Sequence, residues 1–417
     1  MSVRKTLLVG GAVFLALAGA SVCAFLIAYN NDLYTAQPGP SPNIVIRGGA
    51  LFAGTGHAAT ENSTIVIRNG VITCIGTKCE VPVGAIEIDA TDHAILPGMI
   101  DLHGHFFGFR DRPSLPSLIW STIRLRPDFR RAMLEAGVTS FRSVGDPRDA
   151  ILDLKRKLNR RELAGPRMFV AGPIVTAPGG HPTYRGRDLN PGGFGGAMTF
   201  QSNDPLRVAT EVSLLASQGA DGIKAVFHGR ASTPDRPALP TLSVQTLRAL
   251  TQAADARGLW VAVHVGPQGE TKEAVRSGAT TIEHGVRNGH LIDGETLQTL
   301  VANDAVYVPT LGREPEGHLN IPALVKAGVA IGVGTDGEDY NEELSRLVAA
   351  GMSPSAVLLA ATANGAKAIR RLDTLGTIQT GKIADIVIVS GTPWRDIDDI
   401  RSTIMVIQAG YIVLDRR

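Results

Sequence analysis

The sequence predicts an α/β protein: a TIM-like (β/α)8 barrel with a small β-sandwich built from both chain ends, preceded by a transmembrane helix. In the middle of the chain, short apolar strands alternate with helical stretches, which favours a parallel sheet. This region, residues 98–370, has the length that such a barrel takes, typically ~250 residues. Runs rich in Ile and Val recur near both ends of the chain, and they predict the sandwich.

Residues 7–29 are apolar and carry no charged side chain. A helix of this length, rising about 1.5 Å per residue, can cross a hydrocarbon core of about 30 Å. Because Arg4 and Lys5 precede the run, the positive-inside tendency predicts a membrane-anchored protein whose main domain is extracytoplasmic, that is, periplasmic. The alternative is a signal peptide cleaved at Ala18-Gly19-Ala20, which would release a secreted protein. Residues 1–29 are therefore an anchor or a signal segment.

The rest of the chain divides where its composition changes. Residues 30–42 are polar and Pro-rich, as in a linker. Residues 43–97 and 371–417 are expected to form the two parts of the sandwich. Their β-patterned runs are 43–47, 63–68, 71–75 and 85–89 in the first part, and 385–389, 404–408 and 411–414 in the second.

Cys74 and Cys79 flank a Gly-containing turn in the first sandwich part. An exported location is oxidising, so we expect them to form a disulfide, with two free thiols as the alternative. Soft metal ligands do not surround this pair in the sequence, which argues against a metal site there.

Within the barrel region we expect strands at the apolar runs and helices between them. The strands are 139–144, 167–172, 222–227, 260–265, 280–283, 305–309 and 330–334, and the helices include 127–136, 206–218, 243–256 and 354–370. The composition, 44% hydrophobic and 19% charged, is that of a globular protein. A net charge of +2 with dispersed basic residues gives no indication of nucleic-acid binding.

Residues that can bind metal lie at or just past the ends of these apolar runs, where the chemistry of such barrels is located. His103 and His105 are two residues apart on a strand, so both side chains point to the same face. Imidazoles and carboxylates suit Zn²⁺ and similar cations. The candidate metal ligands are His103, His105, Lys224, His264, His284 and Asp336. Asp101 is interpreted as a structural neighbour of this set.

The motifs in this order resemble the amidohydrolase superfamily of metal-dependent hydrolases. They include Pro-Gly-Met-Ile-Asp-Leu-His-Gly-His at 97–105, Gly-Thr-Asp at 334–336 and the tail motif at 376–389. The resemblance covers roughly residues 43–417. It implies two divalent metal ions, with Zn²⁺ favoured, the first bound by the first two histidines and Asp336, the second mainly by His264 and His284.

The resemblance also implies that Lys224 is carboxylated and bridges the two metals, because an ammonium group would be repelled by two dications. The sequence does not show this modification. The alternative is an ordinary lysine that pairs with Asp221 or Glu211.

Within the superfamily, Glu283 and a Gly-Gly-His loop favour the branch of prolidase-type dipeptidases and imidazolonepropionase-related proteins. The expected reaction is hydrolysis of a C–N amide bond in an N-acyl amino acid or dipeptide by a metal-bridging hydroxide, with Asp336 as general acid and base. Enzyme alternatives on the same centre are a cyclic-amide hydrolase, a lactonase or an organophosphate-type esterase. A membrane-tethered scaffold is a non-enzyme alternative, but a decayed site should have lost at least one ligand.

Substrate contacts are expected from loops that follow the strands. His181, in the Gly-Gly-His loop, is a candidate catalytic residue that polarises the scissile carbonyl, and it is also a candidate substrate contact. A guanidinium group suits a carboxylate. The candidate contacts are His181, Tyr184, His228 and Arg230, each with an ordinary loop residue as the alternative. The expected partners are a small molecule or dipeptide and a membrane through residues 7–29; homo-oligomerisation stays open.

Overall fold

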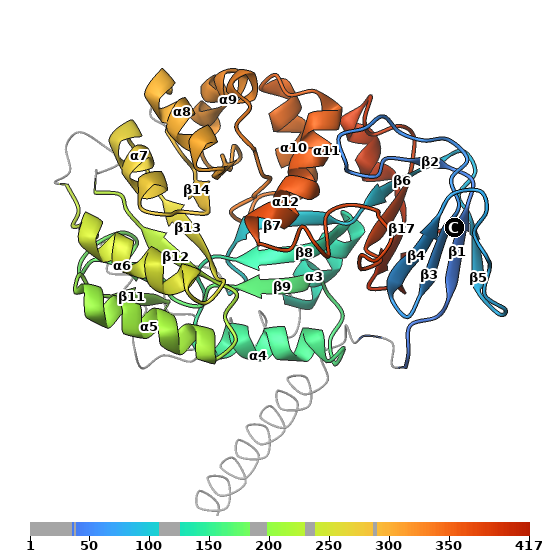
Figure 1. Ribbon diagram of the computed structural model, residues 1–417, viewed down its shortest axis with the longest axis horizontal. Helices are drawn as coiled ribbons and strands as arrows, with labels where there is room; N and C mark the ends of the chain where they lie inside the picture. The colour runs from blue at the N-terminus through green and yellow to red at the C-terminus, as the bar shows by residue number, and fades with distance from the viewer. Residues whose placement is uncertain (1–35, 37–38, 108–125, 184–197, 230–237, 287–289) are drawn as a thin grey trace, which may run out of the picture.

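The computed structural model describes residues 36, 39–107, 126–183, 198–229, 238–286 and 290–417. Figure 1 shows a β-rich part, in which blue and red strands lie side by side, next to a larger part where helices surround strands. The predicted α/β fold is therefore present. Among the described residues, no helix is both long enough and apolar enough to cross a bilayer. The predicted segment 7–29 lies outside the described residues.

The larger part contains two sheets of parallel strands. β7 (Met99–Gly104), β8 (Val138–Ser143) and β9 (Arg167–Val170) form one of them. The other has the order β11 (Thr199–Gln201), β10 (Ile174–Thr176), β12 (Gly222–Val226), β13 (Trp260–His264), β14 (Thr281–Glu283) and β15 (Val306–Val308). Most of these side chains are buried on both faces, as expected for parallel strands covered by helices.

Backbone hydrogen bonds join the two parallel sheets at both ends. Asp221 N donates to Val170 O at 2.9 Å, which links the start of β12 to β9. Leu102 N donates to Val333 O at 2.8 Å, so β7 lies beside the segment that follows β15. The predicted strand 330–334 is not a regular strand, because only an isolated parallel bridge, Tyr307 to Ile331, is formed there. Glycines at 332 and 334 explain this, since they weaken strand structure and allow β7 to approach closely.

Helices lie around these sheets, and polar caps define where several of them begin. Asp204, Ser243, Asp293, Asp339 and Ser353 each accept hydrogen bonds from backbone N–H groups in the first turn. The capped helices are α5 (Pro205–Ser217), α6 (Val244–Asp255), α8 (Gly294–Ala302), α10 (Tyr340–Ala349) and α11 (Pro354–Ala361). The others described are α3 (Arg126–Glu135), α4 (Arg148–Asn159), α7 (Gln268–Arg276), α9 (Ile321–Ala327) and α12 (Ala363–Ala368), with short 3-10 helices η3 (Pro315–Asn320) and η4 (Ile397–Ser402).

The prediction of one helix over 354–370 is wrong. Thr362 interrupts it with φ −124° and ψ −85°, and α11 and α12 lie on either side. The Thr362 hydroxyl donates to Leu358 O at 2.6 Å, a local side-chain bond that competes with the helical pattern.

The β-rich part combines strands from both ends of the chain (Figure 1). One sheet has the order β4 (Val71–Ile75), β3 (Ile65–Arg68), β1 (Ile44–Arg47) and β5 (Ile86–Asp89). The other has the order β18 (Tyr411–Asp415), β17 (Thr403–Gln408), β16 (Ile386–Ser390), β6 (His93–Pro97) and β2 (Ala50–Leu51). An apolar cluster that includes Ile44, Ile65, Ile95 and Ile386 joins the two sheets.

Asp385 attaches the β-rich part to the parallel sheets. Its carboxylate accepts from Arg167 Nη1 at 2.6 Å and Nη2 at 3.2 Å, and from Ala409 N at 2.8 Å. Arg167 begins β9, so this bidentate pair ties the end of the chain to the edge of the first parallel sheet.

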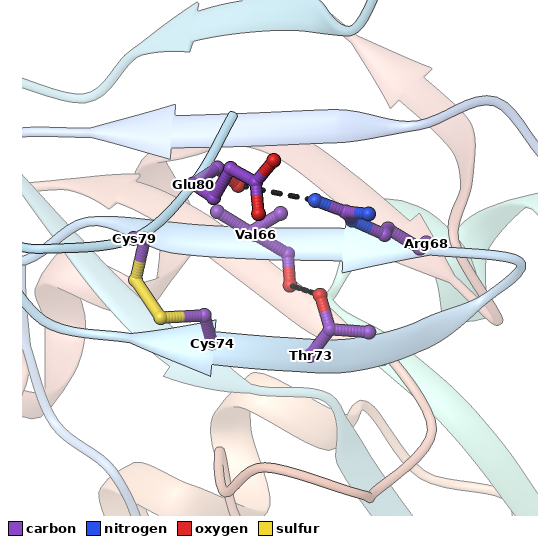
Figure 2. The surroundings of a disulfide bond; sticks show 6 residues. All are labelled: Val66, Arg68, Thr73, Cys74, Cys79 and Glu80. Atoms are coloured by element: carbon purple, nitrogen blue, oxygen red, sulfur yellow. Dashed lines mark hydrogen bonds between the residues drawn. A yellow bond between two sulfur atoms is a disulfide. The ribbon is translucent and has the colours of Figure 1, made fainter. Parts of the chain in front are cut away.

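The predicted disulfide between Cys74 and Cys79 is present, with the two Cα atoms 5.7 Å apart (Figure 2). Hydrogen bonds surround it: Thr73 Oγ1 donates to Val66 O at 3.2 Å, and Arg68 donates to Glu80 O at 3.3 Å. The bond therefore closes a loop at the end of the β3–β4 hairpin.

We expect Cys74→Ser/Cys79→Ser to lower the free energy of unfolding by about 2 kcal/mol, because so short a cross-linked loop restricts the unfolded chain only modestly. The midpoint of denaturant unfolding measures this change. Reduced wild-type protein is the matched control and should unfold at the same midpoint as the variant. An unchanged midpoint in the variant would contradict the expectation.

Candidate metal centre

The strand ends bring four imidazoles together. The ring centres of His103 and His284 lie 4.7 Å apart, and those of His264 and His284 lie 4.5 Å apart. The ring of His105 lies 5.7 Å from that of His103. These residues come from β7, β13 and the end of β14, so segments distant in sequence meet at the carboxyl edges of parallel strands.

Asp336 completes a group of three potential ligands with His103 and His105. One ligand atom from each lies within 4.8 Å of the others. Asp336 Oδ1 lies 3.5 Å from His105 Nε2 and 3.9 Å from His103 Nε2. The Asp336 backbone has φ 50°, in the left-handed region, and its N–H donates to His103 O at 2.7 Å. This constrained backbone directs the carboxylate at the two imidazoles.

Hydrogen bonds on the far side of each ring leave both Nε2 atoms facing Asp336. His105 Nδ1 donates to Gly145 O at 2.8 Å. His103 Nδ1 lies 2.5 Å from Glu283 Oε2, to which it donates. A proton on each Nδ1 leaves the lone pair of each Nε2 available, which is how carboxylates and carbonyls orient metal-binding histidines.

Arg142 holds Glu283 in place below the imidazoles. Arg142 Nη2 donates to Glu283 Oε1 at 2.7 Å and Nη1 donates to Thr281 Oγ1 at 3.0 Å, while Nε donates to Leu102 O. Both Arg142 and Glu283 are completely buried. The motif analysis used Glu283 only to assign a branch and missed Arg142; an arginine within an apolar strand was the available signal.

Lys224 lies on β12, two percent exposed and in register with Ala262 of β13. Burial depresses the pKa of His103, and the charge of Lys224 adds to this effect. The alternative partners of this lysine are engaged elsewhere. Asp221 pairs with Lys155 at 2.7 Å, and Glu211 pairs with Arg148, so each of these carboxylates already has a basic partner.

His284 is held by a neighbouring turn. Its Nδ1 lies 2.7 Å from the Oγ1 of Thr310, and its backbone has φ 65°, in the left-handed region. Thr310 shares that conformation, with φ 51°. Non-glycine residues in this region are uncommon and persist where the surrounding structure enforces them.

Burial favours neutral forms of the central groups. It depresses the pKa of His103 well below its ordinary range and that of His105 to about 4. It raises the pKa of Asp336 to about 6. At neutral pH the imidazoles of His103 and His105 are therefore uncharged. In this form each can bind a divalent cation through a nitrogen lone pair.

Asp101 has the structural role expected of it. It accepts from His103 N at 3.0 Å, from Thr335 N at 3.2 Å and from Thr335 Oγ1 at 2.8 Å. Its carboxylate thus clamps the strand that carries the first histidine to the segment that carries Asp336.

Two of the predicted substrate contacts lie at the edge of this group. The ring of His181 stacks on that of His264 with centres 4.7 Å apart, and the ring of His228 lies 5.7 Å from His264. His228 Nδ1 lies 2.8 Å from Glu270 Oε2, a carboxylate that the sequence analysis missed. Tyr184 and Arg230 lie outside the described residues.

The turn after β15 carries Arg313, a cation on the solvent-exposed side of Asp336. Arg313 Nε lies 3.8 Å from Asp336 Oδ2, and Arg313 is more than half exposed. The sequence analysis did not single it out. Its position shortly after the predicted strand 305–309 was the only available signal.

The donor set fits a divalent metal. Two imidazole Nε2 atoms with oriented lone pairs face one carboxylate oxygen, and two further imidazoles adjoin them. Nitrogen donors with a carboxylate suit Zn²⁺ and similar ions.

Comparisons with known proteins found similar sequences and similar structures. The model of the amidohydrolase family matches residues 94–413. An imidazolonepropionase from Porphyromonas gingivalis is 25% identical over 378 residues, covering 80% of this chain and 84% of the relative. The crystal structure of a Xaa-Pro dipeptidase with bound methionine is similar with a TM-score of 0.77 and 26% identity, covering 89% of this chain and 99% of that one. A putative prolidase from Bifidobacterium longum shares the fold at 23% identity, with a TM-score of 0.75 and coverage of 91% and 97%.

We expect Glu283→Gln to weaken metal affinity roughly 10- to 100-fold. The amide that replaces the carboxylate would no longer hold the proton on His103 Nδ1, and Arg142 would lose its carboxylate partner. Titration of the metal-free chain with Zn²⁺, followed by competition with a chelator, measures this. Glu295→Gln, at an exposed ion pair on α8, is the matched control. Equal affinities of the Glu283 variant and the control would show that the contact does not support the site.

A second prediction concerns Glu343, whose carboxylate accepts from Leu311 N at 2.6 Å and Gly312 N at 2.8 Å. Burial raises the pKa of Glu343 from 4.5 to about 7. A raised pKa means that the folded state binds the proton more tightly. The stabilising contribution is therefore complete below about pH 4.5 and is lost as the pH rises through about 7, a change on the order of 3 kcal/mol.

Glu343→Gln should flatten this part of the pH dependence. Urea unfolding of both proteins at pH 5 and pH 7, with a chelator present, measures the difference. Parallel pH dependence in wild type and variant would be the contrary result.

Proposed function

The chain belongs to the amidohydrolase family and is a hydrolase acting on carbon–nitrogen bonds, and from this premise we propose a binuclear metal-dependent enzyme that cleaves an N-acyl amino acid or a dipeptide. The convergence of His103, His105 and Asp336 is the observation that carries the proposal. The adjoining His264 and His284 supply donors for a second ion.

A closed TIM-like barrel is part of this proposal. It is supported by the parallel order of β7 to β9 and β12 to β15, and by the hydrogen bonds that join the two sheets at each end. In such a barrel the catalytic groups gather at the carboxyl ends of the strands, where these histidines lie.

Two divalent ions, with Zn²⁺ favoured, would be held by the six ligand candidates, and Lys224 would bridge them as a carbamate. When bound, the ions supply positive charge that polarises a carbonyl and promotes ionisation of water. Imidazoles that are neutral and oriented by Glu283 and Gly145 need no rearrangement to act as ligands.

Asp336 would carry the proton. Water attacks the carbonyl carbon of the amide, and the Asp336 carboxylate accepts the proton that this water releases. It then donates that proton to the amide nitrogen as the C–N bond breaks and the amine leaves. His181, stacked on His264 at the edge of the site, would orient the scissile carbonyl, and His228 would contact the substrate.

Two similarities favour two different substrate classes. The similar Xaa-Pro dipeptidase structure contains methionine in its active site, which favours a peptide or N-acyl amino acid for this chain. A second candidate is a cyclic amide, which the similarity to imidazolonepropionase favours. Lactones and phosphotriesters have no comparable support among these relatives.

For the location, we propose that residues 7–29 anchor the chain in a membrane, with the catalytic part extracytoplasmic. The charge-free apolar run supports this, and so does the Cys74–Cys79 disulfide, since such bonds persist in oxidising compartments.

Metal analysis combined with a substrate panel tests the function. We expect about two divalent ions per chain and turnover of N-acyl amino acids or dipeptides in preference to cyclic amides, lactones and phosphotriesters. Asp336→Asn is the control variant and should lower kcat by orders of magnitude, because the proton carrier is removed. A chain that binds no metal and hydrolyses no amide would overturn the proposal.

We expect Lys224→Ala to lose metal and activity together, because the bridging carboxylate disappears. A short carboxylic acid such as acetate or propionate should restore part of both by occupying its place. Lys155→Ala, which removes the ion-pair partner of Asp221, is the control and should retain its metal. Normal metal content in Lys224→Ala would refute the bridging role.

A further inference from the structure

Arg313 provides a cation on the open side of the candidate metal centre. Its Nε lies 3.8 Å from Asp336 Oδ2, whereas Asp336 Oδ1 faces the imidazoles of His103 and His105. Two other cations near these ligands, Arg142 and Lys224, are buried beneath them. Arg313 is 56% exposed, so a substrate can reach its guanidinium from solvent.

The backbone that carries Arg313 is fixed on two sides. On one side, Glu343 accepts from Leu311 N and Gly312 N at 2.6 and 2.8 Å. On the other, Thr310 contacts His284 Nδ1 through its hydroxyl at 2.7 Å, and Arg313 N donates back to Thr310 O at 3.0 Å. A Cβ at Gly312 would come within 3.0 Å of Glu338 and Arg346 side chains, so glycine lets the turn pack closely. The turn 310–314 is thus positioned by a metal-ligand candidate and by a buried carboxylate.

The chemistry of the leaving group determines what this guanidinium would meet. Asp336 delivers its proton to the amide nitrogen, which must therefore come within hydrogen-bond distance of the carboxylate. If the leaving amine is an α-amino acid, its carboxylate carbon is two bonds from that nitrogen, about 2.5 Å across. A group 3.8 Å from the far oxygen of Asp336 lies within reach of such a carboxylate.

We propose that Arg313 recognises the free α-carboxylate of the amino acid released by hydrolysis, which makes it a specificity-determining residue for substrates with a carboxylate on the leaving-group side. This inference rests on the proposed amide hydrolysis. The planar guanidinium pairs with a carboxylate through two parallel hydrogen bonds, which a point charge does not reproduce.

Glu338 competes with a substrate carboxylate for Arg313. Its Oε1 lies 3.4 Å from Arg313 Nη1, and it is itself partly exposed. A surface pair of this kind contributes little, typically below about 1 kcal/mol, so a substrate carboxylate can replace it. If Arg313 served only to balance Asp336 and Glu338, its loss would affect substrates with and without a carboxylate equally.

Binding of a product and its neutral analogue to the metal-loaded, full-length chain tests the inference independently of turnover. L-methionine and L-methioninamide differ in the carboxylate, and calorimetry or thermal shift measures both. We expect wild type to bind the acid more tightly. Arg313→Met should weaken binding of the acid roughly 10- to 100-fold and leave the amide within about twofold, with Arg313→Lys in between.

Kinetics provide the second readout. For N-acetyl-L-methionine, Arg313→Met should raise KM by the same factor, whereas the KM for N-acetyl-L-methioninamide should stay within about twofold. Any change in kcat that follows from the lost charge beside Asp336 should be the same for both substrates. Arg401→Met, at a surface ion pair between η4 and α10, is the matched control and should behave as wild type. Arg230→Met is the informative comparison, because Arg230 is the carboxylate contact that the sequence suggested.

Three results would overturn the role of Arg313: wild type that binds acid no better than amide, equal losses for both ligands in Arg313→Met, or a carboxylate-specific loss in Arg230→Met alone. Absence of all amide turnover in wild type would instead overturn the proposed function, and the binding experiment would still decide the role of Arg313.

Discussion

The candidate metal centre depends on a buried hydrogen-bonded chain from Arg142 through Glu283 to His103. It joins β8, β14 and β7, three strands that are not all neighbours in one sheet. A buried carboxylate without its cation would be strongly destabilising, so these strands have to keep the register in which the three groups meet. The same contact that keeps the charges paired also keeps a proton on His103 Nδ1 and so directs Nε2 to the site.

The strands and the loops contribute differently to the centre. Residues on strands, such as His103 and Lys224, are held by the ladder and by packing on both faces. His181, His228 and Arg313 lie on loops that bring their side chains to the edge of the candidate metal centre. Each loop is tied to a strand-end group or a buried carboxylate, as Glu343 ties the turn 310–314. This division is typical of enzymes in which a rigid scaffold presents variable loops to the substrate.

Periodicity and motif order predicted much of the fold, with most strand and helix bounds within one or two residues of those observed. The failures are local. The helix over 354–370 breaks at Thr362, where a side-chain hydrogen bond competes with the backbone, and the strand at 330–334 forms a single bridge where two glycines let β7 approach. Arg142, Glu270 and Arg313 were missed as site residues because the groups that they contact are distant in the sequence. The local signals, an arginine within an apolar strand and a position shortly after a strand, do not name those partners.

The sequence by itself determined the alternation of strands and helices and the set of strand-end ligand candidates, and it favoured the pairing of Cys74 with Cys79 that the structure shows. These follow from patterns within a few residues, where side-chain period and turn chemistry act directly. Only the tertiary structure decided which groups support the ligands: Glu283 behind His103, Thr310 beside His284 and Arg313 facing Asp336. All three contacts join different segments of the chain. They therefore depend on how the backbone is placed in space, which residue order alone does not specify.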